Sequence, residues 1–366
     1  MGKAIAKQRN GKIDLLRFLF SLTVIFYHLN VDLSARKLRI GDFTFFSEGR
    51  IAVEFFFLVT GYLTAAKIYK MRNSANKVPS LGESTWDFMR KKIATILPYH
   101  FIAIALIIIL YCSMNQQNVF RYMIKSLPSI FLLQMSGLPG SNVIGNEWYL
   151  SSMLIALLIL YPICLRFYDA FTRIVAPIVG VFAVGTVIHN TGALGYNTEY
   201  IGMFYAGNIR AIGVISLGMF SFELFRAIRS AETVRQKRVL FTILEVFGYG
   251  FTLFYMTSTM MGKKQGGIIA LILCITVGIS FSELSYGQRF FHHRLFSFLG
   301  KCSLPIYLSQ NIFREIGKKY LFEYSSIYYI LFVLFGSIIF GIVLTCFVDG
   351  MKKLFFRLRQ KSSAVS

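Results

Sequence analysis

Apolar runs of roughly 17–25 residues recur along the whole chain, and each is long enough to cross a hydrocarbon core of ~30 Å. Lipid offers the backbone no hydrogen-bond partners, so a run that crosses a bilayer alone must be helical. The sequence therefore predicts an all-α integral membrane bundle of about ten transmembrane helices. The predicted spans are Ile13–Leu33, Ile51–Tyr69, Ile93–Tyr111, Trp148–Leu165, Ile174–His189, Ile212–Ile228, Val239–Thr257, Gly267–Leu284, Phe296–Phe313 and Ile327–Phe347.

Composition supports this class of protein. Hydrophobic residues make up 55% of the chain and charged residues only 15%, and the mean hydropathy is +0.58. Soluble domains carry about 25% charged residues. No polar stretch is long enough to build a separate soluble domain, so we expect one transmembrane domain over residues 1–350 and a basic tail over residues 351–366. Four of the five cysteines lie in apolar runs and resemble small hydrophobes, so no metal site is expected.

The formal net charge of +22 does not indicate a nucleic-acid partner, because the basic residues gather in the predicted loops. Positive loops face the cytoplasm, which places both termini and the Lys67–Lys92 loop there and makes this a multi-pass protein of the cell membrane. A full span at Tyr122–Met135 would put every later basic loop on the wrong side. We therefore expect Met114–Glu147 to be one long external loop, and its re-entry into the membrane is left open.

Asp14, Arg17 and His28 are ionisable residues that lie within the first predicted span. Ionisable side chains inside membrane helices are costly and usually functional. Arg17 and His28 are eleven positions apart, which is about three helical turns or ~16 Å. Eleven steps return to within ~20° of the starting direction, so both side chains lie on one face of the helix. The alternatives are an arginine whose charge snorkels to the cytoplasmic surface and a structural histidine with satisfied hydrogen bonds.

Five sequence elements together resemble the membrane acyltransferase-3 family. The first is IDLLRFLFSLTVIFYH, with arginine, ten residues and then histidine, at Arg17 and His28. The others are GRIAVEFFFLVTGYL, FMRKKIATILPY, EWYLSS and LGKCSLPIYLSQ, which begin at Gly49, Phe88, Glu147 and Leu299. The chain departs from the family pattern at Thr95, Met153 and Gln310, where family members usually have a second arginine, an acidic residue and a histidine. The resemblance covers nearly the whole chain, in a form without an extracytoplasmic esterase domain.

The resemblance implies a membrane O-acyltransferase that takes an acyl group from cytoplasmic acetyl-CoA. The acceptor would be a hydroxyl of a surface or lipid-linked glycan, with His28 as general base near neutral pH. Arg17 would pair with a phosphate or stabilise charge along the acyl arm, and Arg90, Lys91 and Lys92 would form a phosphate clamp. The expected partners are thus acyl-CoA, a sugar acceptor and membrane lipid; the oligomeric state and the choice between acetyl and longer acyl groups stay open.

Three further residues are candidates for contacting the substrate. Trp148 and Tyr307 would line the acyl or sugar path, with interfacial placement or bundle packing as the alternative. Glu54 would orient His28, or would simply begin a helix near the outer headgroups. Two other functions compete with acyl transfer: a proton-coupled transporter, against which the lack of an internal repeat counts, and a non-catalytic membrane protein of polysaccharide assembly.

Overall fold

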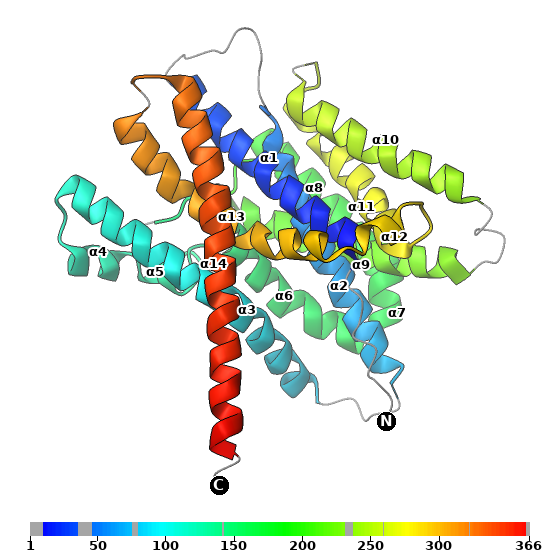
Figure 1. Ribbon diagram of the computed structural model, residues 1–366. Coiled ribbons are helices and arrows are strands. Elements are labelled where there is room, and N and C mark those ends of the chain that lie inside the picture. The colour runs from blue at the N-terminus through cyan, green and yellow to red at the C-terminus, as the bar shows by residue number, and fades with distance from the viewer. Residues whose placement is uncertain are drawn as a thin grey trace.

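The computed structural model describes residues 10–35, 46–74, 80–140, 143–230, 237–258, 260–321 and 323–363, and these residues form a helical bundle (Figure 1). Long helices occupy all ten predicted positions. They are α1 (Gly11–Ala35), α2 (Ala52–Arg72), α3 (Leu81–Asn115), α6 (Trp148–Arg166), α8 (Ala176–Thr191), α9 (Ala206–Ser230), α10 (Arg238–Thr257), α11 (Gly266–Ser282), α13 (Arg294–Tyr320) and α14 (Ser326–Ser363).

Short elements connect these helices. They are η1 (Gly49–Ile51), α4 (Val119–Lys125), α5 (Leu127–Ile130), α7 (Tyr168–Ala170), the π-helical η2 (Phe171–Val175), η4 (Lys263–Gln265), α12 (Gln288–Phe291) and a hairpin of β1 (Tyr200–Ile201) and β2 (Phe204–Tyr205). Within the described part of the chain, nine helices are long and apolar enough to cross a membrane. The tenth, α13, has the length, but Lys301, Gln310 and Asn311 make it more polar.

The largest extensions beyond the predicted spans are at the start of α3 and at the end of α14. Ser80 and Glu83 form a reciprocal capping box, so α3 starts at Leu81 instead of Ile93. The expected Lys67–Lys92 loop was therefore wrong in extent: its basic ends belong to α2 and α3, and only the short stretch between Arg72 and Leu81 connects them. At the other end of the chain, the tail continues α14 as helix to Ser363, far below the rest of the bundle in Figure 1.

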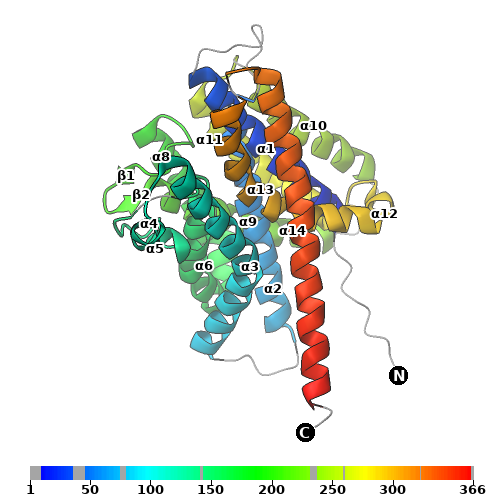
Figure 2. The same cartoon turned by 60° about the vertical axis from the view of Figure 1, so that its left-hand side comes forward.

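The long connection between α3 and α6 contains no spanning helix in its described residues. It holds only α4, of 7 residues, and α5, of 4 residues, as the charge distribution predicted for Tyr122–Met135. Figure 2 shows this connection beside the β1–β2 hairpin. Both lie at the end of the bundle predicted to be extracytoplasmic, away from the end where α2 finishes, α3 starts and α14 finishes.

Candidate active site

A cavity of about 520 Å³ opens among α1, α2, α3, α6, α13 and α14. Four of these helices are the first four long helices of the chain and the other two are the last two, so the fold brings together segments that are far apart in sequence. Residues that line it are Arg17, Val53, Phe56, Val59, Thr60, Lys92, Thr95, Ile96, Tyr99, Tyr149, Leu150, Met153, Gly300, Lys301, Ser303, Leu304, Tyr307, Asp349 and Lys352. Its volume lies in the range of ~300–1,000 Å³ usual for small-molecule sites.

Positive charge dominates the polar part of this lining. Within the described lining, four helices each supply one cation, from Arg17, Lys92, Lys301 and Lys352, against a single carboxylate, Asp349. Asp349 pairs with Lys301 at 3.0 Å. We call these four cations the basic cluster. A surplus of cations on the wall of a cavity is suited to phosphate groups.

Arg17 and Lys92 of the basic cluster were predicted from the sequence, whereas Lys301 and Lys352 were not. Lys301 is a lone cation in a predicted span, which is the signal that singled out Arg17. Lys352 gave no such signal, because it follows the last apolar run and belonged to the expected tail. It reaches the cavity only because α14 continues past the apolar run as a helix.

Apart from Thr60, Thr95 and Ser303, the rest of the described lining is apolar or aromatic. The rings of Tyr149 and Tyr307 meet edge to face with centroids 6.0 Å apart, and Phe56 lies against Tyr149 at 6.0 Å. The cavity thus combines a cationic part with an apolar, tyrosine-lined part. Tyr307, a predicted substrate contact, lies in the lining. Tyr149 lines the cavity in place of its neighbour Trp148.

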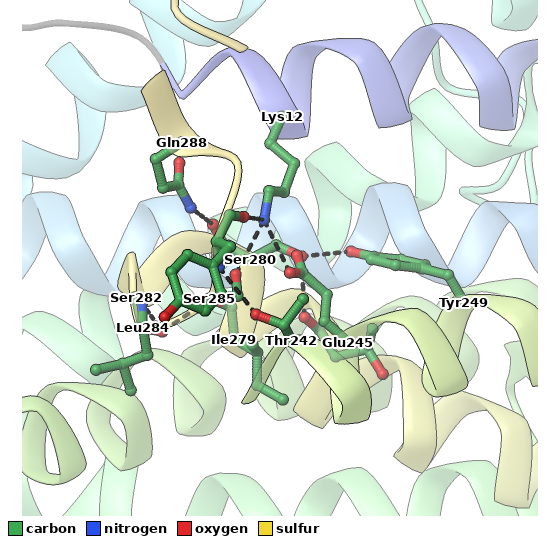
Figure 3. A network of polar contacts seen from close by, with 12 residues as sticks. Lys12, Thr242, Glu245, Tyr249, Ile279, Ser280, Ser282, Leu284, Ser285 and Gln288 are labelled. Atoms are coloured by element: carbon green, nitrogen blue, oxygen red, sulfur yellow. Dashed lines mark hydrogen bonds and ion pairs between the residues drawn. The ribbon is translucent and has the colours of Figure 1, made fainter. Parts of the chain in front are cut away.

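The start of α1 is anchored by a buried polar network (Figure 3). The Lys12 ammonium donates to Glu245 of α10 at 2.8 Å and to Ser285 at 2.9 Å. The other Glu245 oxygen accepts from Ser280, whose hydroxyl also bonds Tyr249 at 2.9 Å. The Lys12 side chain is itself buried in this network. The anchor fixes the helix that carries Arg17.

Close contact between α1 and α13 positions Arg17. Its guanidinium lies 3.6 Å from the Asp14 carboxylate, which also accepts a hydrogen bond from Ser297 at 3.3 Å. Helix α13 approaches α1 here because Gly300 has no side chain. A Cβ at Gly300 would lie 2.5 Å from the Cβ of Asp14, well inside normal contact.

His28 lies on α1 and is not a lining residue of the cavity, and its hydrogen-bond partner is Gln310 of α13, three residues after the lining residue Tyr307. Its Nδ1 is 3.0 Å from the Oε1 of Gln310, and the Nε2 of Gln310 donates to the backbone carbonyl of Tyr307 at 2.9 Å. A carbonyl accepts only, so the Gln310 amide must turn its NH₂ to Tyr307 and its oxygen to His28. Nδ1 of His28 is then the protonated nitrogen, and Nε2 carries the lone pair.

The Gln310 position was identified in the sequence only as a departure from the family pattern. The structure shows that this residue is the direct partner of His28 and that it also contacts the cavity wall at Tyr307. Asn146 strengthens the link: its amide donates to the Tyr307 carbonyl at 2.9 Å, and its own carbonyl accepts from the Tyr307 hydroxyl. The wall of the cavity and the imidazole are thus joined by hydrogen bonds.

One turn after His28, Asp32 forms a second link between α1 and α13. Arg314 donates to both Asp32 oxygens, at 2.7 and 2.8 Å, and Tyr329 of α14 donates at 2.7 Å. Arg314 also bonds Asn311, which in turn donates to Asn146 at 2.6 Å. Paired, hydrogen-bonded charges of this kind hold helices in one register.

Glu54 does not form a pair with His28. Both of its oxygens accept from Arg210 of α9, at 2.5 and 2.6 Å, and both side chains are buried. The Arg210 guanidinium also lies 5.1 Å from the centre of the Trp148 ring. Trp148 therefore packs on this ion pair. Arg210 lies just before the predicted span Ile212–Ile228 and was not predicted to be a functional or structural residue.

The three residues of the predicted phosphate clamp do not lie on the same side of α3. Lys92 belongs to the basic cluster. Arg90 and Lys91 lie on the exposed side of the same helix, paired with Asp87 at 3.1 and 3.6 Å. Their contact with a phosphate stays a prediction. It would require the phosphate end of the acyl donor to extend out of the cavity.

One buried histidine escaped the sequence reasoning. His100 of α3 lies 2.7 Å from Glu147, and its other ring nitrogen bonds the Ile130 carbonyl at 3.0 Å. It stands inside a predicted span, so the rule applied to His28 would have found it. It ties α3 to the residue that precedes α6, which holds Asn146 in place against Tyr307.

Comparison with known proteins agrees with the sequence elements described above. No curated protein and no solved structure matches the chain. Among protein families, the acyltransferase-3 model, described as an acyltransferase domain, matches residues 10–346. The matched region includes all but one member of the basic cluster, together with His28 and Gln310. This match over nearly the entire chain shows that the protein belongs to the acyltransferase-3 family of membrane acyltransferases.

Proposed function

We propose that this acyltransferase moves an acetyl group from cytoplasmic acetyl-CoA to a hydroxyl of a surface or lipid-linked glycan in the cell membrane. The observation that carries the proposal is the hydrogen-bonded link from the tyrosine-lined cavity through Gln310 to His28. It connects a cavity suited to an acyl-CoA with a nitrogen able to accept a proton.

The cavity suits both the phosphate end and the acyl end of acetyl-CoA. The CoA phosphates need cations, and the basic cluster provides four around one carboxylate. The pantetheine arm and the acyl group need an apolar channel with few polar contacts, and Phe56, Tyr149 and Tyr307 provide one. Arg17 would contact a phosphate or the polar part of the arm.

His28 would then act as the general base. Its Nε2 takes the proton from the acceptor hydroxyl, and the oxygen attacks the thioester carbonyl. The carbon–sulfur bond breaks as the ester forms, and the CoA thiolate leaves and takes the proton back from the imidazolium. Gln310 stabilises the imidazole throughout by accepting from Nδ1–H.

The test is an acetyl-transfer assay with radiolabelled acetyl-CoA in membranes that contain the protein. Removal of a general base costs about 10²–10⁴ in rate, so His28→Ala should lose at least a hundredfold at normal expression. His189→Ala, on an exposed histidine of α8, is the matched control. Full activity of His28→Ala would overturn the role of the base.

The same assay separates the two competing functions. A proton-coupled transporter would move an unchanged solute, and an assembly protein without catalysis would transfer no label. Transfer of label from acetyl-CoA to a saccharide product, lost in His28→Ala, excludes both. Substitution of propionyl-CoA or succinyl-CoA for acetyl-CoA measures the preference for the acyl group.

A further inference from the structure

A second, smaller cavity lies at the end of the bundle away from the basic cluster. It has a volume of about 220 Å³ and lies between the connection that follows α5 and the β1–β2 hairpin. Its lining residues are Pro128, Gln134, Met135, Gly137, Leu138, Pro139, Gly140, Thr198 and Tyr205. None of them lines the larger cavity of about 520 Å³.

The amide of Gln134 is unusual in this cavity. Its nitrogen and its oxygen are both buried, and neither has a hydrogen-bond partner among the described residues. A buried amide without partners destabilises the fold, and native proteins contain few such groups. A ligand with adjacent donors and acceptors would satisfy both atoms at once.

The walls of the cavity are firmly held. The Met135 amide donates to Ser151 of α6 at 3.2 Å, and the Met135 carbonyl accepts from Asn208 of α9 at 2.8 Å. Tyr205 is braced by Tyr200, whose ring centre lies 4.2 Å away. The cavity is therefore formed before any ligand arrives, which lowers the cost of binding.

The lining chemistry limits the kind of ligand. Among the lining residues that the structure describes there is no charged side chain, so an anionic or cationic group would find no ionic partner there. Neighbouring hydroxyls of a sugar each donate and accept, which matches one free amide with Thr198 and Tyr205 nearby. A water occupies only ~30 Å³ in the liquid, whereas sites for drug-sized ligands begin at about 300 Å³; a single sugar ring falls between them.

We propose that the Gln134 cavity is a binding subsite for one neutral sugar unit of a saccharide. The choice of a sugar rests in part on the proposed function, because a glycan acceptor would meet this end of the bundle. The subsite would hold a unit of the acceptor chain away from the reacting hydroxyl, and so it would contribute to acceptor affinity and not to the chemical step.

The experiment measures equilibrium binding to the purified full chain in nanodiscs. The probes are maltose, cellobiose and lactose as neutral disaccharides, and glucuronic acid and glucose 6-phosphate as charged sugars. Gln134→Met keeps the length of the side chain and removes both hydrogen-bonding atoms. Gln117→Met, on an exposed glutamine of the same connection, is the matched control.

We expect at least one neutral disaccharide to bind, Gln134→Met to weaken it about tenfold or more, and Gln117→Met to leave it unchanged. The melting temperature of Gln134→Met should equal or exceed that of the wild type, because the amide has no partner to lose. A lower melting temperature, equal binding by Gln134→Met, tighter binding of the charged sugars, or no binding of neutral saccharides would each overturn the subsite.

This experiment and the acetyl-transfer assay can fail separately. Binding that depends on Gln134 supports the subsite even if no label moves from acetyl-CoA. Conversely, if the enzyme transfers label in a His28-dependent manner and Gln134→Met changes neither saccharide binding nor the KM for the acceptor, acyl transfer stands and the subsite is wrong.

Discussion

The Nδ1 atom of His28 on α1 lies 3.0 Å from the Oε1 atom of Gln310 on α13, and the opposite side of that amide is held by the Tyr307 carbonyl. The pair fixes the imidazole in the tautomer that leaves Nε2 able to accept a proton. Because 282 positions separate the two residues, only the tertiary structure reveals this relationship.

Removal of the Gln310 amide should slow the chemical step. Gln310→Leu leaves Nδ1–H without its acceptor, so we expect kcat to fall between about tenfold and a hundredfold, less than loss of the base itself costs. Gln310→Glu keeps an acceptor oxygen and should retain more activity than Gln310→Leu. Wild-type kcat in Gln310→Leu would contradict the positioning role. Ser309→Ala, at the neighbouring buried residue, is the control.

The basic cluster should control affinity for the donor. Lys352→Ala should raise the KM for acetyl-CoA about twofold to fivefold, the range that ~0.4–1 kcal/mol of a largely exposed ion pair provides. The increase should shrink as salt is raised. Lys353→Ala alters the next residue, which is also exposed but does not line the cavity, and should leave the KM unchanged. Equal effects of both substitutions would indicate general attraction by the α14 tail.

A parallel comparison on α3 tests the predicted clamp. If the cavity alone holds the phosphates, Lys92→Ala should raise the KM for acetyl-CoA and Lys91→Ala should not, because Lys91 pairs with Asp87 on the exposed side. If the nucleotide end of the donor extends out of the cavity, Arg90→Ala and Lys91→Ala should also raise the KM. Isothermal titration with free CoA checks both outcomes without turnover.

A methyl group at Gly300 should separate α1 from α13. The Cβ of Gly300→Ala would lie 2.7 Å from Asp14 Oδ1, so α1 must shift and carry Arg17 with it. Overpacking of this kind costs about 1–3 kcal/mol, and we expect a lower melting temperature and a higher KM for acetyl-CoA. Gly350→Ala, on α14, meets no atom within 4 Å and should be neutral or mildly stabilising. Unchanged stability of Gly300→Ala would show that the contact is loose.

The buried ion pair of Glu54 and Arg210 should be structural. Removal of one partner leaves an uncompensated buried charge, which costs about 3–5 kcal/mol. Glu54→Gln and Arg210→Met should each lower the melting temperature sharply, and the double variant should lose less than the sum. A Glu54→Gln variant that folds normally but loses acceptor affinity would instead favour the direct substrate contact predicted from the sequence.

Local sequence patterns predicted the transmembrane helices well because lipid imposes a simple requirement: an apolar run must be helical to cross. The start of α3 and the end of α14 were not predicted, because hydropathy marks only the part of a helix that crosses the lipid. A helix continues beyond the apolar run wherever caps and charged side chains support it in the headgroup region, and hydropathy carries no record of that. Lys92 and Lys352 reach the cavity from those unpredicted turns.

The sequence by itself determined the class of protein, the helical positions, the family resemblance and the shared face of Arg17 and His28, because these follow from spacing along one helix. The tertiary structure alone decided that Gln310 partners His28, that Arg210 partners Glu54, and that Lys301 and Lys352 join Arg17. These contacts form between helices that are distant in the chain. The tertiary fold determines which polar groups meet. Inside the bilayer these groups have no water to bond instead, so each must find its partner on a neighbouring helix.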